Sequence, residues 1–273
     1  MKKPTALLTL LVLAGAPAFA AQLLTLNKGD HICYLGNALA DRMQHHGFLE
    51  TFIHAKFPDD ELVFRNLAAS GDEVATWHRS ENFGSRDDWL TKTKADVIFA
   101  FYGFNESFQG KDGLDKFKKD LDQFLKDTRA KNYSGRGAPR VVLFSPIAGE
   151  KINDPDLPDP TANNARLKLY TDAMAEVARI NSVPFVDLFS VSQRLYAQAA
   201  QQGRPLTFNT FMLTEAGNKA LAPEIFRALF NAASPAGNLE KLRAAVLDKN
   251  EQWHARYRTV DGYNVYGGRS KLE

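Results

Sequence analysis

The stretch VIFAFYGFNE at residues 97–106 decides the fold of this chain. Its first five residues, Val97–Phe101, form an apolar run typical of a buried β-strand, and the loop that follows carries Gly103, Asn105 and Glu106. In an open parallel sheet, ligands bind at the carboxyl ends of the strands. The stretch therefore predicts a central strand that delivers two polar side chains to a site at its end.

Short apolar segments of the same kind recur along the chain and alternate with amphipathic helices. This alternation predicts a parallel sheet covered by helices on both faces. The expected strands are Ile32–Leu35, Leu62–Asn66, Val97–Phe101, Val141–Phe144 and Pro184–Val186. The expected helices are Ala38–Lys56, Asp87–Thr93, Gly113–Lys131, Asn164–Asn181, Ser190–Gln202 and Thr214–Phe230, followed by a helical segment at Leu239–Arg258 and a small hairpin at Gly262–Arg269.

Four sequence blocks fall at the places where such a sheet forms a site. They are Tyr34–Ala38 after the first strand, Ser70–Asp72 after the second, Gly103–Glu106 after the third, and Asn209–Thr214 before the helix at Thr214–Phe230. In this order and spacing, Lys28–Phe230 resembles the SGNH (GDSL-type) hydrolases, in a divergent exported bacterial subgroup. The resemblance implies a flavodoxin-like α/β/α sandwich of three layers with a five-stranded parallel sheet.

The same resemblance assigns roles that this chain fills only in part. Gly71 and Asn105 match the family's oxyanion-hole donors, which stabilise the charge of a tetrahedral intermediate. The nucleophile position holds Ala38, the base position holds Met212, and Asn209 stands where the orienting carboxylate is expected. Neither a methyl group nor a thioether exchanges a proton. We therefore assign no catalytic residue and expect a degenerate triad.

Other polar residues near these blocks are candidates for ligand binding: Asn37, Arg42, Ser70, Asp72, Glu73 and Glu106. Their carboxylates could serve as a metal site or a glycosidase acid/base pair, or Arg42 simply neutralises one of them. Ser70 and Ser107 are the substitute nucleophiles to consider. His45, His46 and His54 are expected on the first helix as surface or packing residues, whereas His78 or His254 could fold over the pocket. Because no HxxxH or HExxH spacing occurs, we predict no metal.

The N-terminal segment and the composition of the chain narrow the class of protein to which it belongs. Residues 1–20 read as a signal peptide that ends in Ala18-Phe19-Ala20, so we expect an exported protein, periplasmic or secreted. Residues 21–233 would form the hydrolase-like domain and residues 234–273 a C-terminal extension. A net charge of +2 with interspersed signs argues against nucleic acid, and the single Cys33 excludes an internal disulfide and multi-cysteine cofactor sites. We expect no cofactor, and no stable membrane span after cleavage.

Two functions remain open on the sequence. The first is a pseudoenzyme whose pocket binds a small molecule, a sugar or an acylated ligand. The second is an exported esterase, or another acyl or carbohydrate-active hydrolase, that uses a rearranged site. Protein partners are not indicated.

Overall fold

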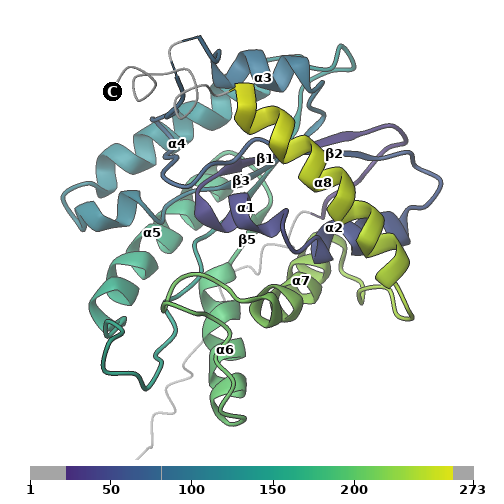
Figure 1. Ribbon diagram of the computed structural model, residues 1–273. Coiled ribbons are helices and arrows are strands. Elements are labelled where there is room, and N and C mark those ends of the chain that lie inside the picture. The colour runs from purple at the N-terminus through teal and green to yellow at the C-terminus, as the bar shows by residue number, and fades with distance from the viewer. Residues whose placement is uncertain (1–22, 81, 261–273) are drawn as a thin grey trace, which may run out of the picture.

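The computed structural model describes residues 23–80 and 82–260. Its centre is a five-stranded parallel sheet in the order β2-β1-β3-β4-β5 (Figure 1). The strands are β1 (His31–Gly36), β2 (Val63–Asn66), β3 (Val97–Phe101), β4 (Arg140–Phe144) and β5 (Phe185–Val186). Because β3 lies in the middle, Phe101 stands in register with both Gly36 and Phe144. The expected α/β sandwich with a five-stranded parallel sheet is confirmed.

Helices form a layer on each face of the sheet because successive strand residues point to opposite sides. Ile32 and Tyr34 belong to one apolar core, and Cys33 and Leu35 belong to the other. The first core is closed by α1 (Ala38–Met43), α2 (Phe48–Lys56), α6 (Leu188–Ala200) and α7 (Glu215–Phe230). The second is closed by α3 (Arg86–Lys92), α4 (Leu114–Arg129) and α5 (Thr161–Ile180), and the short 3₁₀ helix η1 (Glu106–Gln109) precedes α4.

One expected helix, Ala38–Lys56, is wrong as a single element. The chain forms α1 and α2 instead, with a turn between them that contains His45 and His46, while His54 lies on α2. Gly47 ends the turn in the left-handed conformation, with φ of 66°, which a helix interior does not allow. A Cβ on this glycine would lie 3.0 Å from the Val246 side chain, so close packing of the C-terminal helix also requires glycine here.

That C-terminal helix, α8 (Glu240–Val260), lies along the free edge of the sheet beside β2 and α2 (Figure 1). An edge strand leaves backbone groups without a neighbour. Here α8 supplies the missing donors: Trp253 donates to the carbonyl of Asn66 at 2.7 Å, and Tyr257 donates to that of Leu67 at 2.9 Å. Tyr257 is only 2% exposed and belongs to the second core, so α8 seals this edge.

Several expectations concern the ends of the chain. The signal peptide at 1–20 and the hairpin at Gly262–Arg269 lie outside the described residues. Among the residues that the structure describes, no helix has the length and apolarity needed to cross a membrane.

Cys33 is fully buried in β1, and burial raises the pKa of its thiol to about 12, as suits a packing residue.

Candidate functional site

The position of the expected nucleophile is fixed by a tight connection between β1 and α1. Gly36 has φ of 122°, and a Cβ there would lie 1.9 Å from the carbonyl oxygen of Phe101. Asn37 then caps α1, accepting a hydrogen bond from the backbone N–H of Leu39 at 3.3 Å. Ala38 is therefore the first residue of α1 and lies at the carboxyl edge of the sheet. The local geometry expected for a nucleophile is present without a nucleophile.

The loop that carries the expected base reaches the same place from the far end of the domain. Asn209 accepts hydrogen bonds from the backbone N–H groups of Phe211 at 3.3 Å and Met212 at 2.8 Å. Its side chain therefore shapes its own loop. Thr214 follows and caps α7 through the N–H of Gly217. These bonds hold Met212 in a defined turn at the mouth of a small pocket.

Ala38 and Met212 line one pocket, although they are far apart in the sequence. Among the described residues, its other lining members are Asn37, Leu39, Phe104, Pro146, Ile147 and Phe211. The cavity has a volume of about 20 Å³, room for about one water molecule, and all but one of its lining side chains are apolar. The structure thus brings positions 38 and 212 together, and none of the described residues that line the recess is a serine, cysteine or histidine.

The blocks that carry the two expected oxyanion donors are in contact, but neither donor lines this pocket. Asn105 donates from its side-chain nitrogen to the carbonyl oxygen of Asp72 at 3.1 Å, so the second and third blocks are in contact. Gly71 is exposed, with φ of 97°, and a Cβ added to it would meet no atom within 4 Å. The amide of Asn105 is thus engaged in tying the two blocks together.

The acidic candidates are placed away from Ala38. Asp72 forms a buried ion pair with Arg79, in which the two side chains are each 2% exposed. Glu106 accepts from the backbone N–H groups of Val74 and Gly103 at 2.9 Å each, and burial raises the pKa of its carboxyl to about 7. Glu73 and Glu106 line a separate cavity of about 250 Å³ between the loop at 73–76 and α4. These carboxylates therefore do not border the Ala38 pocket.

The remaining polar candidates have partners of other kinds. The hydroxyl of Ser70 donates to Asp41 at 3.1 Å, and that of Ser107 donates to the carbonyl of Phe104 at 2.6 Å. Arg42 lies with its guanidinium 5.2 Å from the centre of the Phe208 ring, and its Nε is buried without a hydrogen-bond partner. The cation that pairs with Asp72 is Arg79, a residue that sequence reasoning did not select.

Two exposed phenylalanines beside the pocket, here called the aromatic rim, were also not predicted. They are Phe108, whose ring contacts the lining residue Phe104, and Phe208, whose backbone N–H donates to the carbonyl of the lining residue Met212 at 3.0 Å. Phe104 contacts Phe108 and Phe211, each at 5.7 Å between ring centres. Phe108 and Phe208 are 59% and 52% exposed, unusual for phenylalanine, and each has an arginine at its ring face, Arg166 and Arg42 respectively. In the sequence, only the clustering of phenylalanines in the loops at 104–108 and 208–211 could have indicated them. Exposure of a side chain depends on the fold and cannot be read from the sequence.

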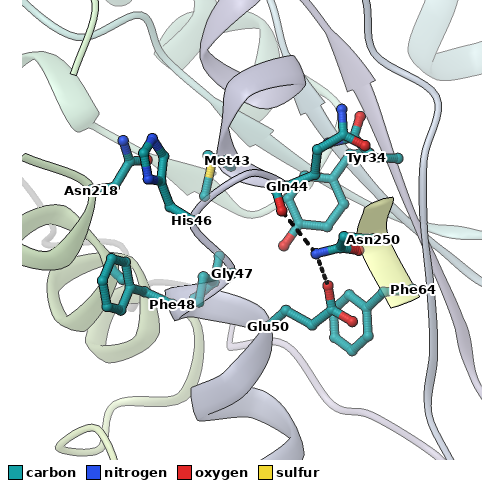
Figure 2. Close-up of a pocket in the computed structure, with 13 residues that line it drawn as sticks. Tyr34, Met43, Gln44, His46, Gly47, Phe48, Glu50, Phe64, Asn218 and Asn250 are labelled. Carbon is teal, nitrogen blue, oxygen red and sulfur yellow. Dashed lines mark hydrogen bonds between the residues drawn. The ribbon is translucent and has the colours of Figure 1, made fainter. Parts of the chain in front are cut away.

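Figure 2 shows a second recess, where α8 meets α2. Asn250 donates to the carbonyl of Gln44 and to the carboxylate of Glu50, both at 3.1 Å. Glu50 also pairs with Lys249 at 2.7 Å. Burial opposes its ionisation, but His54 and Lys249 outweigh burial and lower the pKa of its carboxyl. The cavity of about 20 Å³ lies within this network, which serves as a polar joint between the helices.

Residues 29–220 match the model of the GDSL-like lipase/acylhydrolase family. The chain belongs to this family. A comparison with curated proteins finds no match. Solved structures with the same fold include a catalytic mutant of Axe2, an acetylxylan esterase from Geobacillus stearothermophilus, which shares 15% identity over 78% of this chain and 100% of its own, with a TM-score of 0.59.

Two other solved structures show the same fold. LAE5, an α/β hydrolase from the metagenome of Lake Arreo in Spain, is 18% identical over 75% of this chain and 96% of its own, with a TM-score of 0.57. BT4096, a gut microbial diltiazem-metabolizing enzyme, is 19% identical over 77% of this chain, which spans 49% of that protein, with a TM-score of 0.60. At these identities the likeness extends to the fold and not to the chemistry of the site.

Proposed function

We propose that this GDSL-like protein binds an acylated carbohydrate at the Ala38 pocket and does not hydrolyse it. The observation that carries the proposal is that Ala38 and Met212 line the same apolar recess. A serine hydrolase that loses its triad keeps only about 10³–10⁴-fold enhancement over water. With nucleophile and base both replaced, and Asn209 engaged by its own loop, we expect no useful turnover by this route.

The size and lining of the pocket support a short acyl group as the buried part of the ligand. A volume of about 20 Å³ admits the methyl end of an acetyl group but not a sugar ring. The sugar would then lie outside, against the exposed rings of Phe108 and Phe208. Aromatic faces offer a rigid apolar surface, and Arg42 beside Phe208 offers charge-assisted hydrogen bonds to oxygen atoms.

The alternative, an esterase with a relocated nucleophile, requires a serine activated by a base. The two candidate hydroxyls donate to the Asp41 carboxylate and to the Phe104 carbonyl, and neither bond is to an imidazole. This geometry supports the binding function over the esterase. The predicted signal at residues 1–20 would place the binder in the periplasm or outside the cell.

The test compares acetylated xylooligosaccharides with the same oligosaccharides after chemical deacetylation, by isothermal titration calorimetry. We expect tighter binding of the acetylated form and no release of acetate. Ala38→Val, which fills the recess, should abolish the preference for the acetylated form. Arg42→Ala should weaken binding of both forms by roughly ten- to a hundred-fold, the value of one charge-assisted hydrogen bond.

The matched control is Ile180→Ala, because Ile180 is 60% exposed at the end of α5 and outside the pocket. It should bind as the parent does. Equal affinity of the parent, Ala38→Val and Arg42→Ala proteins for an acetylated ligand would remove this pocket as the binding site. Turnover of p-nitrophenyl acetate together with stoichiometric fluorophosphonate labelling would instead establish an esterase, and labelling at Ser70 or Ser107 would locate its nucleophile.

A further inference from the structure

Three side chains from separate parts of the chain converge beside α1. Asp41 lies on α1, His45 lies in the turn after it, and His254 lies on α8. Their ligand atoms all lie within 4.8 Å of one another, and the two imidazole rings are 5.1 Å apart between centres. We infer that Asp41, His45 and His254 form a binding site for a divalent transition metal, with zinc as the cation that fits best.

The donor set determines the class of metal. Two imidazole nitrogens and one carboxylate oxygen suit zinc and its neighbours in the transition series, whereas calcium and magnesium prefer oxygen alone. Ligands at 2.0–2.1 Å from a tetrahedral zinc are about 3.4 Å apart. The three groups must therefore close by at most roughly 1.4 Å from the 4.8 Å that bounds them now. His45 is exposed, so its side chain has room to adjust toward the other two groups, and solvent can supply the fourth ligand.

The backbone places the three ligands by simple rules. Asp41 and His45 are four residues apart, and the N–H of His45 bonds the carbonyl of Arg42 at 3.0 Å, so the turn stays wound and the pair shares one face. His254 comes from α8, which the contacts of Trp253 and Tyr257 already hold against the sheet edge. The site is independent of the Ala38 pocket, since none of its three ligands lines that pocket.

The Asp41 carboxylate is oriented by its neighbours, as metal-binding carboxylates generally are. One oxygen accepts from the N–H and the hydroxyl of Ser70, both at 3.1 Å. The other accepts from Arg258 at 2.8 Å and from Gln44 at 3.1 Å. A bound metal would replace one of these hydrogen-bond donors at the carboxylate. The positive charge of the Arg258 guanidinium opposes the approach of the cation. The site should therefore bind zinc reversibly, and loss of the Arg258 charge should tighten binding.

The experiment uses the chain purified without a polyhistidine tag, treated with a chelator, and titrated with zinc chloride by calorimetry. We expect one zinc per chain and a rise in the thermal unfolding midpoint, because the metal joins α8 to α1. His45→Gln and His254→Gln should each weaken zinc binding at least tenfold, and Arg258→Gln should strengthen it. His78→Gln is the matched control, because His78 is exposed and lies outside the cluster.

Circular dichroism without metal establishes that each variant is folded, and His45→Gln changes an exposed residue in a turn, so it keeps the test valid if His254→Gln does not fold. Cobalt in place of zinc gives a second readout through its visible absorption. Zinc binding that is absent in the parent, or equal in the His45→Gln and His78→Gln proteins, would overturn the site. Weaker zinc binding by folded Arg258→Gln would remove Asp41 as a ligand.

Discussion

Replacement of Arg79 by leucine should be among the most destabilising single changes in this protein. Arg79 meets Asp72 through two parallel hydrogen bonds, at 2.7 Å and 2.9 Å, and also donates to the Leu67 carbonyl at 3.0 Å. Both side chains of the ion pair are 2% exposed. Arg79→Leu leaves the Asp72 carboxylate buried without its cation, which costs about 3–5 kcal/mol.

The assays are urea unfolding and thermal unfolding at neutral pH, both followed by tryptophan fluorescence and circular dichroism. For a chain of this size, about 3–5 kcal/mol corresponds to a fall in Tm of roughly 6–20 °C. The control is Arg194→Leu, which breaks a pair with Glu224 whose arginine is 47% exposed, and we expect a loss of less than about 1 kcal/mol. The double variant Arg79→Leu/Asp72→Asn should be more stable than Arg79→Leu alone, since it removes the unpaired charge.

Two results would refute this reasoning. A loss for Arg79→Leu no larger than that for Arg194→Leu would mean that water or another cation reaches Asp72. The loss of unfolding free energy in the double variant could also equal the sum of the losses in Arg79→Leu and Asp72→Asn. That result would mean that the two residues act independently.

Three further changes test other parts of the structure. Gly36→Ala should prevent stable folding, measured as loss of the cooperative unfolding transition, because its Cβ would lie 1.9 Å from the Phe101 carbonyl oxygen. Trp253→Ala should cost about 3 kcal/mol in urea unfolding, since it removes a large ring and the bond to the Asn66 carbonyl; no loss would contradict the sealing role of α8. Glu106 has a pKa raised by burial from 4.5 to about 7, so the folded state holds a proton that the unfolded state releases between these values. Stability from this group is complete below pH 4.5 and is lost as the pH rises to 7, by up to about 3 kcal/mol, and Glu106→Gln should flatten this part of the pH profile.

The fold could be predicted from the sequence because its signals are local. Val97–Phe101 is a strand in the structure with the predicted ends, since a continuous apolar run ends where a glycine-containing loop begins. The error at Ala38–Lys56 has an equally local cause. The apolar spacing continues through the break, and the glycine at position 47 is a weak signal until Val246 of α8 is known to pack against it.

The site was harder to predict because its decisive contacts join distant residues through long side chains. Family resemblance placed positions 38 and 212 together, and the structure does so too. Nothing in the sequence distinguished Arg79 from Arg42 as the partner of Asp72, because either side chain is long enough to reach a nearby loop. His254 meets Asp41 only because α8 returns to the sheet edge, so the spacing of histidines gave no indication of that cluster.

The backbone geometry and the apolar lining of the Ala38 pocket fit together physically. Gly36 and Asn37 still present position 38 at the sheet edge, within a recess lined by Leu39, Ile147 and Phe211. A serine hydroxyl in that recess without an imidazole partner would be an unsatisfied polar group, at a cost of about 1–3 kcal/mol. Alanine and methionine at these two positions leave Asn37 as the one polar side chain among the described residues that line the recess. On the proposed function, the recess is a binding site and not a catalytic one. An apolar recess of this size favours a methyl-sized group and leaves recognition of everything else to the exposed rim, which is why the binding test compares ligands that differ only in their acetyl groups.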